Sequence, residues 1–466
     1  MSTIATPRLI QPCYAAQNTA TYSAPMRWSL LMTALIVGLV FFVAGHDFFT
    51  SRAVAYTQSA EEMQAAALGG NLVRRIAFFM LAGWGLILLA VGKRQLKIDW
   101  PLAGSLLAVA GLATASVLWS EEPAMCIRRL LVLLCCGIAA AGAARAFSLR
   151  EIAWLVVIVV GSLAAIGVLT EVMLGTFRPW ASDYRFAGTV HPNTQGPALA
   201  ALCLGAFSLV NDSGRFRPLL WSIFSAGMLL LVLTKSRTAA AALLASLAAV
   251  QVMKLPLRTH VSGGVATAWI AAAGLCSLWI CGFDPATDFR ELFLLGRSDE
   301  SESLSGRTLI WPEVIHYARE RFWLGYGYEG FWTPARIEDI SDELGWGLRE
   351  AHNGYLEMWL WLGAIGVVVS LLTAIAALAA SVRGFRETGD RSYSLPLGLI
   401  VFGLFNSCLE SGFVVISLVP FLLGCCLMRL ALFRDQATFL AETKRGPGAP
   451  RVDASFTVPG SRFAPG

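Results

Sequence analysis

The residues of this chain best suited to chemistry are one histidine and a few cations in its polar segments. His352 could act as a general base, because imidazole accepts a proton from a hydroxyl group near neutral pH. Arg185, Arg237 and Arg307 could bind a diphosphate, because the planar guanidinium group donates paired hydrogen bonds and stays charged. A set drawn from these arginines could neutralise a leaving diphosphate without a metal ion.

Each of these residues also has a structural interpretation. A histidine beside an apolar run is often an interfacial anchor or a helix cap, and residue type alone leaves the role of His352 open. Lys235 and Arg237 lie in a short turn between two apolar runs, where they could cap a helix or contact lipid headgroups. Arg185 has the same ambiguity.

The composition of the chain is that of an integral membrane protein. Hydrophobic residues make up 56% of the 466 positions and charged residues only 14%, whereas about a quarter of a soluble chain is charged. The net charge of +5 is not clustered, so we expect no nucleic-acid partner. The ten cysteines lie mostly in apolar runs without metal-ligand spacing. We therefore expect no metal and no cofactor.

A glycine motif in the chain is a false signal for nucleotide binding. Gly325, Gly327 and Gly330 spell G-x-G-x-x-G, but no strand–turn–helix unit surrounds them. The acidic run at 338–343 is interpreted as a solvated face.

Apolar runs of spanning length predict an all-α, polytopic membrane protein with about 12 transmembrane helices. The runs are 28–44, 76–92, 101–118, 130–147, 152–174, 196–211, 218–234, 238–253, 265–282, 354–380, 395–409 and 413–430. An all-helical bundle is expected because open sheet edges are not tolerated in hydrocarbon. Residues 1–27 form an N-terminal segment, 28–430 the membrane domain, and 431–466 a tail with a disordered composition.

The short connections between the runs orient the chain. Every second connection is basic: Lys93, Arg94 and Lys97; Arg145 and Arg150; Arg215 and Arg217; Lys254 and Arg258; Arg383, Arg386 and Arg391. Cytoplasmic loops are enriched in Lys and Arg, so both termini are predicted to be cytoplasmic. The polar segments 119–123, 175–193, 234–238 and 284–352 then lie on the outer face. Because cations are disfavoured there, Lys235 and Arg237 are better explained as ligands of an anion.

The segment 284–352 is far longer than a connector needs to be. It combines arginines and two histidines with several tryptophans. We expect it to be an extracytoplasmic loop, partly helical and folded over the bundle, with Ile310, Val314, Ile315, Ala318 and Phe322 on an apolar stripe.

Four groups of residues carry a family resemblance. His352-Asn353, nine residues and Gly363-Ala-Ile-Gly366 form the pattern H-[NSQ]-x9-G-x-x-G. The others are Thr234-Lys-Ser-Arg237-Thr, Leu304-Ser-Gly-Arg307-Thr-Leu-Ile-Trp311, and the smaller motifs Trp119-Ser-Glu-Glu-Pro123 and His191-Pro-Asn193. In this order, over roughly residues 110–430, they resemble the O-antigen ligase and Wzy-type polymerase superfamily of bacterial surface-polysaccharide enzymes, especially exopolysaccharide polymerases of the ExoQ type.

The resemblance implies a GT-C-like, metal-independent, inverting glycosyltransferase. Its donor would be a glycan on undecaprenyl diphosphate, and its acceptor a glycan or lipid-linked hydroxyl. His352 matches the acceptor-activating base and Arg237 the diphosphate-binding arginine, and Arg185, Lys235, Arg307 and Asn353 complete the expected substrate site. The enzyme would lie in the bacterial inner membrane with its site on the periplasmic face.

Three functions remain open at this point. The spacing around Arg307 favours a polymerase that joins repeat units, with a flippase and a chain-length regulator as possible partners. A ligase that moves glycan onto lipid A core shares the same histidine pattern. A transporter of the lipid-linked glycan is a different class, but transporters usually carry charged or broken helices at mid-membrane.

Overall fold

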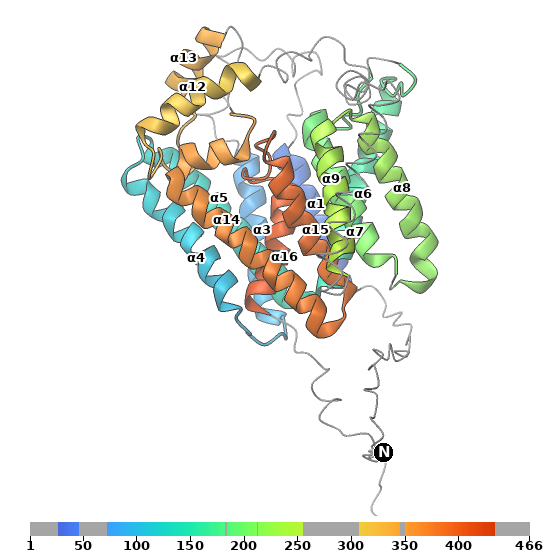
Figure 1. The fold of residues 1–466 in the computed structure, drawn as a ribbon. Helices are drawn as coiled ribbons and strands as arrows, with labels where there is room; N and C mark the ends of the chain where they lie inside the picture. Colours follow the sequence, from blue (N-terminus) through green and yellow to red (C-terminus); the bar gives the residue numbers. More distant parts are fainter. Residues whose placement is uncertain are drawn as a thin grey trace, which may run out of the picture.

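The computed structural model describes residues 27–45, 72–181, 184–211, 213–254, 307–344 and 350–433. Within these ranges every regular element is a helix, and the only sheet-like pairing is an isolated bridge between Lys97 and Phe433. The expected all-α fold is confirmed (Figure 1). The α-helices are α1 (Trp28–Gly45), α3 (Leu72–Val91), α4 (Trp100–Ala115), α5 (Pro123–Ala146), α6 (Leu149–Met173), α7 (Pro192–Leu209), α8 (Arg217–Leu233), α9 (Arg237–Met253), α12 (Arg307–Glu320), α13 (Pro334–Leu344), α14 (Gly354–Thr388), α15 (Ser394–Asn406) and α16 (Leu418–Leu432).

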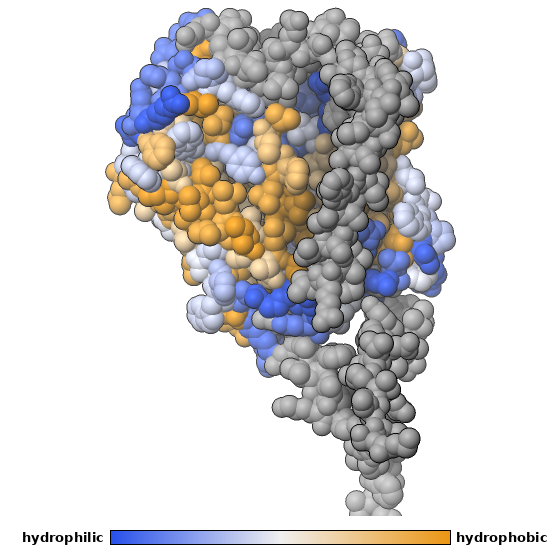
Figure 2. Space-filling view, viewed as in Figure 1, coloured by the Kyte–Doolittle hydropathy of each residue, from blue (hydrophilic) through white to orange (hydrophobic). Residues whose placement is uncertain are grey.

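The helices form a bundle suited to a membrane. Seven of them in the described part are long and apolar enough to cross a bilayer, and α9 and α16 are shorter apolar helices. Figure 2 shows a broad apolar band around the middle of the visible surface, with hydrophilic residues at both ends. Each expected apolar run except 265–282 corresponds to one of the α-helices given above. The run 265–282 lies outside the described residues. The total of about 12 spans therefore remains a prediction.

One end of the bundle collects the basic connections, and we call it the basic end. The guanidinium of Arg383 pairs with Asp99 at 2.5 Å, and Arg94 lies 3.9 Å from Glu151. The backbone N–H of Lys97 donates to the carbonyl of Leu432 (2.7 Å). These contacts join connections that are far apart in sequence, as expected if they share one membrane face.

The opposite end carries the polar segments, and we call it the loop end. It comprises residues 116–122, 171–181, 184–192, 233–237, 321–344, 350–353 and 407–417. Residues 116–122 contact 321–344, 184–192 contact 233–237, and 350–353 contact 407–417. Figure 1 places α12 and α13 beyond the ends of the spans here. Ile310, Val314 and Ala318 are buried in a second core under the loop, which confirms this part of the apolar stripe. The prediction is wrong for Phe322, which is 41% exposed because α12 ends before it, at Glu320.

Close helix packing in the bundle depends on small residues. A Cβ on Gly142 would lie 2.3 Å from the carbonyl oxygen of Gly85, and one on Gly85 would lie 2.5 Å from Ala139. The axes of α3 and α5 can approach this closely only because both glycines lack a side chain.

Helix α14 is broken near its start. Gly363 has φ 68° and ψ −171°, which no α-helical residue adopts. The expected span beginning near Gly354 is therefore corrected: Gly354–Leu362 is a separate segment at the loop end, and the long membrane segment begins after the break. Figure 1 shows the change of direction within α14.

A backbone clasp from the long loop stabilises this break. The N–H groups of Tyr326 and Gly327 donate to the carbonyls of Leu360 (2.7 Å) and Trp361 (2.9 Å). In return, the N–H of Ala364 donates to the carbonyl of Phe322 (2.8 Å). These bonds satisfy groups that the break removes from the helical ladder. The glycine-rich run that includes Gly327 thus has a structural role.

Replacing Gly363 with alanine should destabilise the protein. The positive φ alone costs a non-glycine residue about 1–3 kcal/mol, and the new Cβ would lie 2.1 Å from the backbone of Trp323. We expect Gly363→Ala to lower the melting temperature of the purified protein in detergent by several degrees. Gly83→Ala is the control, because a Cβ there meets nothing within 4 Å. Equal melting temperatures for the two variants would contradict the clasp.

Candidate functional site

The turn between α8 and α9 places two cations at the loop end. Thr234 is the C-cap residue of α8, Lys235 adopts the left-handed conformation (φ 54°), and Arg237 is the first residue of α9. The Oγ1 of Thr234 accepts the N–H of Ser236 (3.1 Å). This tight geometry directs the N-terminus of a 17-residue helix, with its partial positive charge, to the same place as the cations. An anion would be favoured here.

Arg185 braces that turn. Its Nε donates to the carbonyl oxygen of Thr234 (3.0 Å), and its Nη2 donates to the Oδ1 of Asn193 (2.8 Å). At least two of its N–H groups therefore hold protein atoms. The neighbouring His191 caps α7, with its Nδ1 accepting the N–H of Asn193 (3.2 Å). The sequence His191-Pro-Asn193 thus begins a helix beside the turn.

A buried carboxylate supports the segment that carries Arg185. Glu171 is fully buried near the end of α6. It accepts hydrogen bonds from the Tyr184 hydroxyl (2.5 Å) and from the N–H groups of Ala187 (3.0 Å) and Gly188 (2.8 Å). The segment 184–188 is therefore fixed against α6, and Arg185 is held in place with it.

His352 and Asn353 form a second part of the loop end. His352 adopts φ 48°, a strained conformation that persists only when the surroundings impose it. Its Nδ1 lies 3.3 Å from a carboxylate oxygen of Glu350, and about a quarter of its side chain is exposed (25%). Asn353 caps α14 by accepting two backbone N–H groups, and it donates to the carbonyl of Cys408 (2.9 Å). The histidine thus lies between α14 and the connection from α15 to α16.

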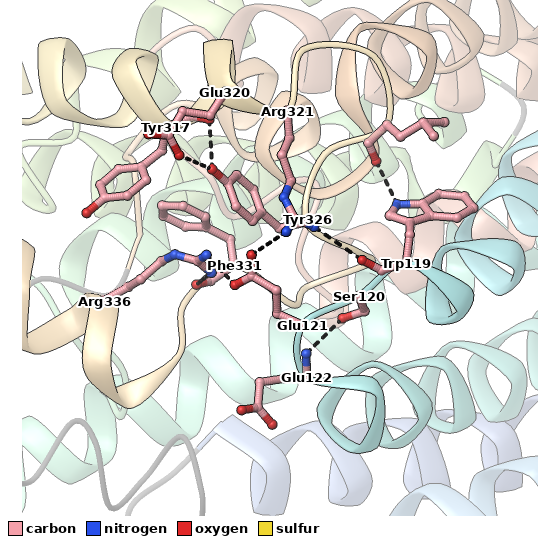
Figure 3. Close-up of polar contacts among 11 residues, drawn as sticks. Trp119, Ser120, Glu121, Glu122, Tyr317, Glu320, Arg321, Tyr326, Phe331 and Arg336 are labelled. Carbon is pink, nitrogen blue, oxygen red and sulfur yellow. Dashed lines mark hydrogen bonds and ion pairs between the residues drawn. The ribbon is translucent and has the colours of Figure 1, made fainter.

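The long loop is fastened to the bundle by a carboxylate on the α4–α5 connection (Figure 3). Glu121 pairs with both Arg321 (2.6 Å) and Arg336. Arg321 also donates to the carbonyl of Trp119 (3.2 Å), and the Trp119 indole donates to the carbonyl of Leu324 (3.1 Å). The motif that begins at Trp119 therefore anchors the loop.

An aromatic ring completes this anchor. The guanidinium carbons of Arg336 and Arg321 lie 4.3 Å and 4.8 Å from the ring centre of Tyr326, within cation–π range. The Tyr326 hydroxyl donates to the carboxylate of Glu320 (2.9 Å). Burial and then this hydrogen bond raise the pKa of Tyr326, so the hydroxyl stays protonated as a donor.

Removing the shared carboxylate should loosen the loop. Glu121→Ala leaves two guanidinium groups around one ring without their anion. Partly exposed ion pairs are each worth up to about 1 kcal/mol, so local opening should become easier by about 1–2 kcal/mol, or roughly 5–30-fold. We expect trypsin to cleave faster after Arg321 and Arg336 by a comparable factor.

Glu122→Ala is the matched control, because Glu122 is the exposed neighbour of Glu121. Cleavage at the same rate in both variants would show that the carboxylate does not hold the loop.

The predicted site residues thus fall into two groups at one end of the bundle. Arg185, Lys235 and Arg237 lie around the α8–α9 turn, and His352 and Asn353 lie at the start of α14. Both α9 and α14 pack against α15. Arg307 begins α12, but its side chain lies outside the described residues.

Sequence reasoning missed two carboxylates of the loop end: Glu171, which supports the segment of Arg185, and Glu121, which fastens the long loop. Glu171 and Glu121 each contact a segment that is distant in the chain, and their local sequence does not indicate which residues they contact. The nearest available signal was the acidic pair within the outer motif that begins at Trp119.

Two comparisons with known proteins relate this chain to others. A family model described as O-antigen ligase matches residues 221–371, the stretch from α8 into α14 that includes Arg237 and His352. The chain is also 24% identical over 340 residues to the exopolysaccharide production protein ExoQ of Rhizobium meliloti (strain 1021), across 68% of this chain and 73% of that protein. The resemblance to the O-antigen ligase and Wzy-like superfamily is confirmed.

Proposed function

From its similarity to the O-antigen ligase and Wzy-like superfamily, we propose that this chain is a membrane glycosyltransferase of polysaccharide synthesis. It joins oligosaccharide repeat units carried on undecaprenyl diphosphate, at the periplasmic face. The observation that carries the proposal is that a cationic helix N-terminus at Arg237 and the constrained His352 lie at the same end of the bundle.

The proposed step divides between the two groups of residues. The diphosphate of the donor binds at the α8–α9 turn, where Arg237, Lys235 and the N-terminus of α9 neutralise the charge that develops as it leaves. His352 takes the proton of the acceptor hydroxyl. The acceptor oxygen bonds to the anomeric carbon from the face opposite the breaking bond, so the configuration inverts. Cations of the protein take the place of a metal ion.

The distribution of buried charge favours an enzyme over a transporter. In the described part, the fully buried charged residues are Asp99, Glu171, Glu357 and Arg429. Each lies in the first or last turn of a helix or at a cap. Transporters place such groups at mid-membrane.

The proposal is tested with purified protein in proteoliposomes and a synthetic lipid-diphosphate-linked repeat unit. We expect longer carrier-linked glycan and free lipid diphosphate, at a rate that EDTA does not change. Transfer only to lipid A core added to the same vesicles would identify a ligase. Movement of the intact donor across the bilayer without a new glycosidic bond would identify a transporter. Strict dependence on a divalent cation would contradict the metal-free step.

A further inference from the structure

A buried carboxyl group contacts the residue that precedes the proposed base. Glu357 is 1% exposed in the first turn of α14. It accepts the backbone N–H of Ala351 (2.5 Å) and the indole N–H of Trp332 (3.0 Å). Burying a polar group costs free energy unless it is hydrogen-bonded, and these two donors bond to the oxygens of the Glu357 carboxyl group.

Ala351 is held from both sides, and it immediately precedes His352. While Glu357 accepts its N–H, its carbonyl accepts the indole N–H of Trp311 on α12 (3.1 Å). Ala351 itself is fully buried. This residue therefore cannot shift without breaking contacts to α12 and α14 together.

The residues after His352 are held as firmly. Asn353 is bonded to the carbonyl of Cys408, and the N–H of Gly354 donates to the carbonyl of Ser407 (2.8 Å). The residues on both sides of His352 are thus held by hydrogen bonds, which explains how its strained φ of 48° is maintained.

The contact to Trp332 extends this support into the long loop. Trp332 lies just before α13 and is 9% exposed. Through Glu357, the folded state of the loop is connected to the backbone beside His352.

We propose that Glu357 is a positioning residue for His352. Glu357 accepts hydrogen bonds from both Ala351 and Trp332. It therefore holds the imidazole in its catalytic position only when the long loop is folded onto the bundle. The inference rests on the proposed function for the role of His352, but the positioning itself can be measured without any glycan.

Two variants separate this role from general stability. Glu357→Gln keeps one acceptor oxygen but turns an NH₂ group toward one of the two donors. Trp332→Phe keeps an aromatic ring but removes the indole N–H and shortens the side chain by one fused ring. The measurements are kcat and KM for the lipid-linked donor, and the rate at which diethyl pyrocarbonate modifies His352, followed by mass spectrometry in donor-free protein.

We expect both variants to lower kcat by about tenfold to a hundredfold, because a displaced catalytic group loses its alignment, with KM for the donor little changed. His352 should be modified severalfold faster in both. The double variant should be no worse than Glu357→Gln alone, since the two residues act through one contact. Glu338→Gln, which removes an exposed carboxylate of α13, is the control and should match the parent.

The outcomes distinguish the two claims. If Glu357→Gln fails to fold, as judged by its elution and melting, Trp332→Phe alone carries the test. Parental modification rates of His352 in the folded variants overturn the positioning, whatever happens to activity. Absence of transfer by the parent overturns the proposed function and leaves the modification result to decide the positioning.

Discussion

His352→Ala should lower the rate of glycan transfer by about a hundredfold to ten-thousandfold, the usual contribution of a general base. The variant should still retain the lipid-linked donor, because the cations around the α8–α9 turn are unchanged. Donor retention is measured by co-purification of labelled donor, and turnover by the length of carrier-linked glycan.

His316→Ala is the matched control for this prediction. His316 is an exposed histidine of α12 on the same loop, where its Nε2 lies 3.5 Å from Glu320. Its replacement should leave transfer at the parental rate. If His352→Ala transferred glycan at the parental rate, His352 would not be the base. Its constrained backbone would then have only a structural role.

Arg237→Ala should lower transfer by about a hundredfold to a thousandfold, the cost of removing one preorganised donor to a developing charge. Arg237→Lys should recover little of this loss, because lysine keeps the charge but loses the planar fork. Unlike His352→Ala, both variants should also bind the donor more weakly.

Arg391→Ala provides the comparison at the basic end, where Arg391 is exposed. It should insert, fold and transfer normally. If Arg237→Ala behaved in the same way, the turn would be an ordinary headgroup contact.

The bundle and its two ends could be predicted from sequence because they follow from hydropathy and the bias of charge. Spans such as α6 are uncharged between their first and last turns, and the basic connections alternate with the others. The structure confirms that distant basic connections meet, as in the pair of Arg383 with Asp99.

The broken start of α14 could not be predicted in the same way. Gly363 continues an apolar run, so periodicity extends the helix through it. The break depends on backbone partners from residues 322–327, and such long-range pairing leaves no local pattern. The same holds for Glu121, whose partners Arg321 and Arg336 are about two hundred residues away.

The sequence could nominate the residue types of the candidate site, but not the side chains that hold them in place. Lys235 and Arg237 were identified from a short cationic turn, and His352 from a histidine beside an apolar run. That Arg185 braces the turn, and that Glu357 holds the residue before His352, depends on side-chain directions in three dimensions.

The central claim is that one lipid-diphosphate-linked glycan spans both groups of residues at the loop end. It is tested most directly with a donor that carries a photoreactive sugar, bound to the purified protein and cross-linked, with adducts located by mass spectrometry. We predict adducts both in 233–238 or 184–193 and in 350–354 or 407–411, all suppressed by excess unlabelled donor. Adducts confined to the basic end, or to only one of the two groups, would contradict a single site shared by Arg237 and His352.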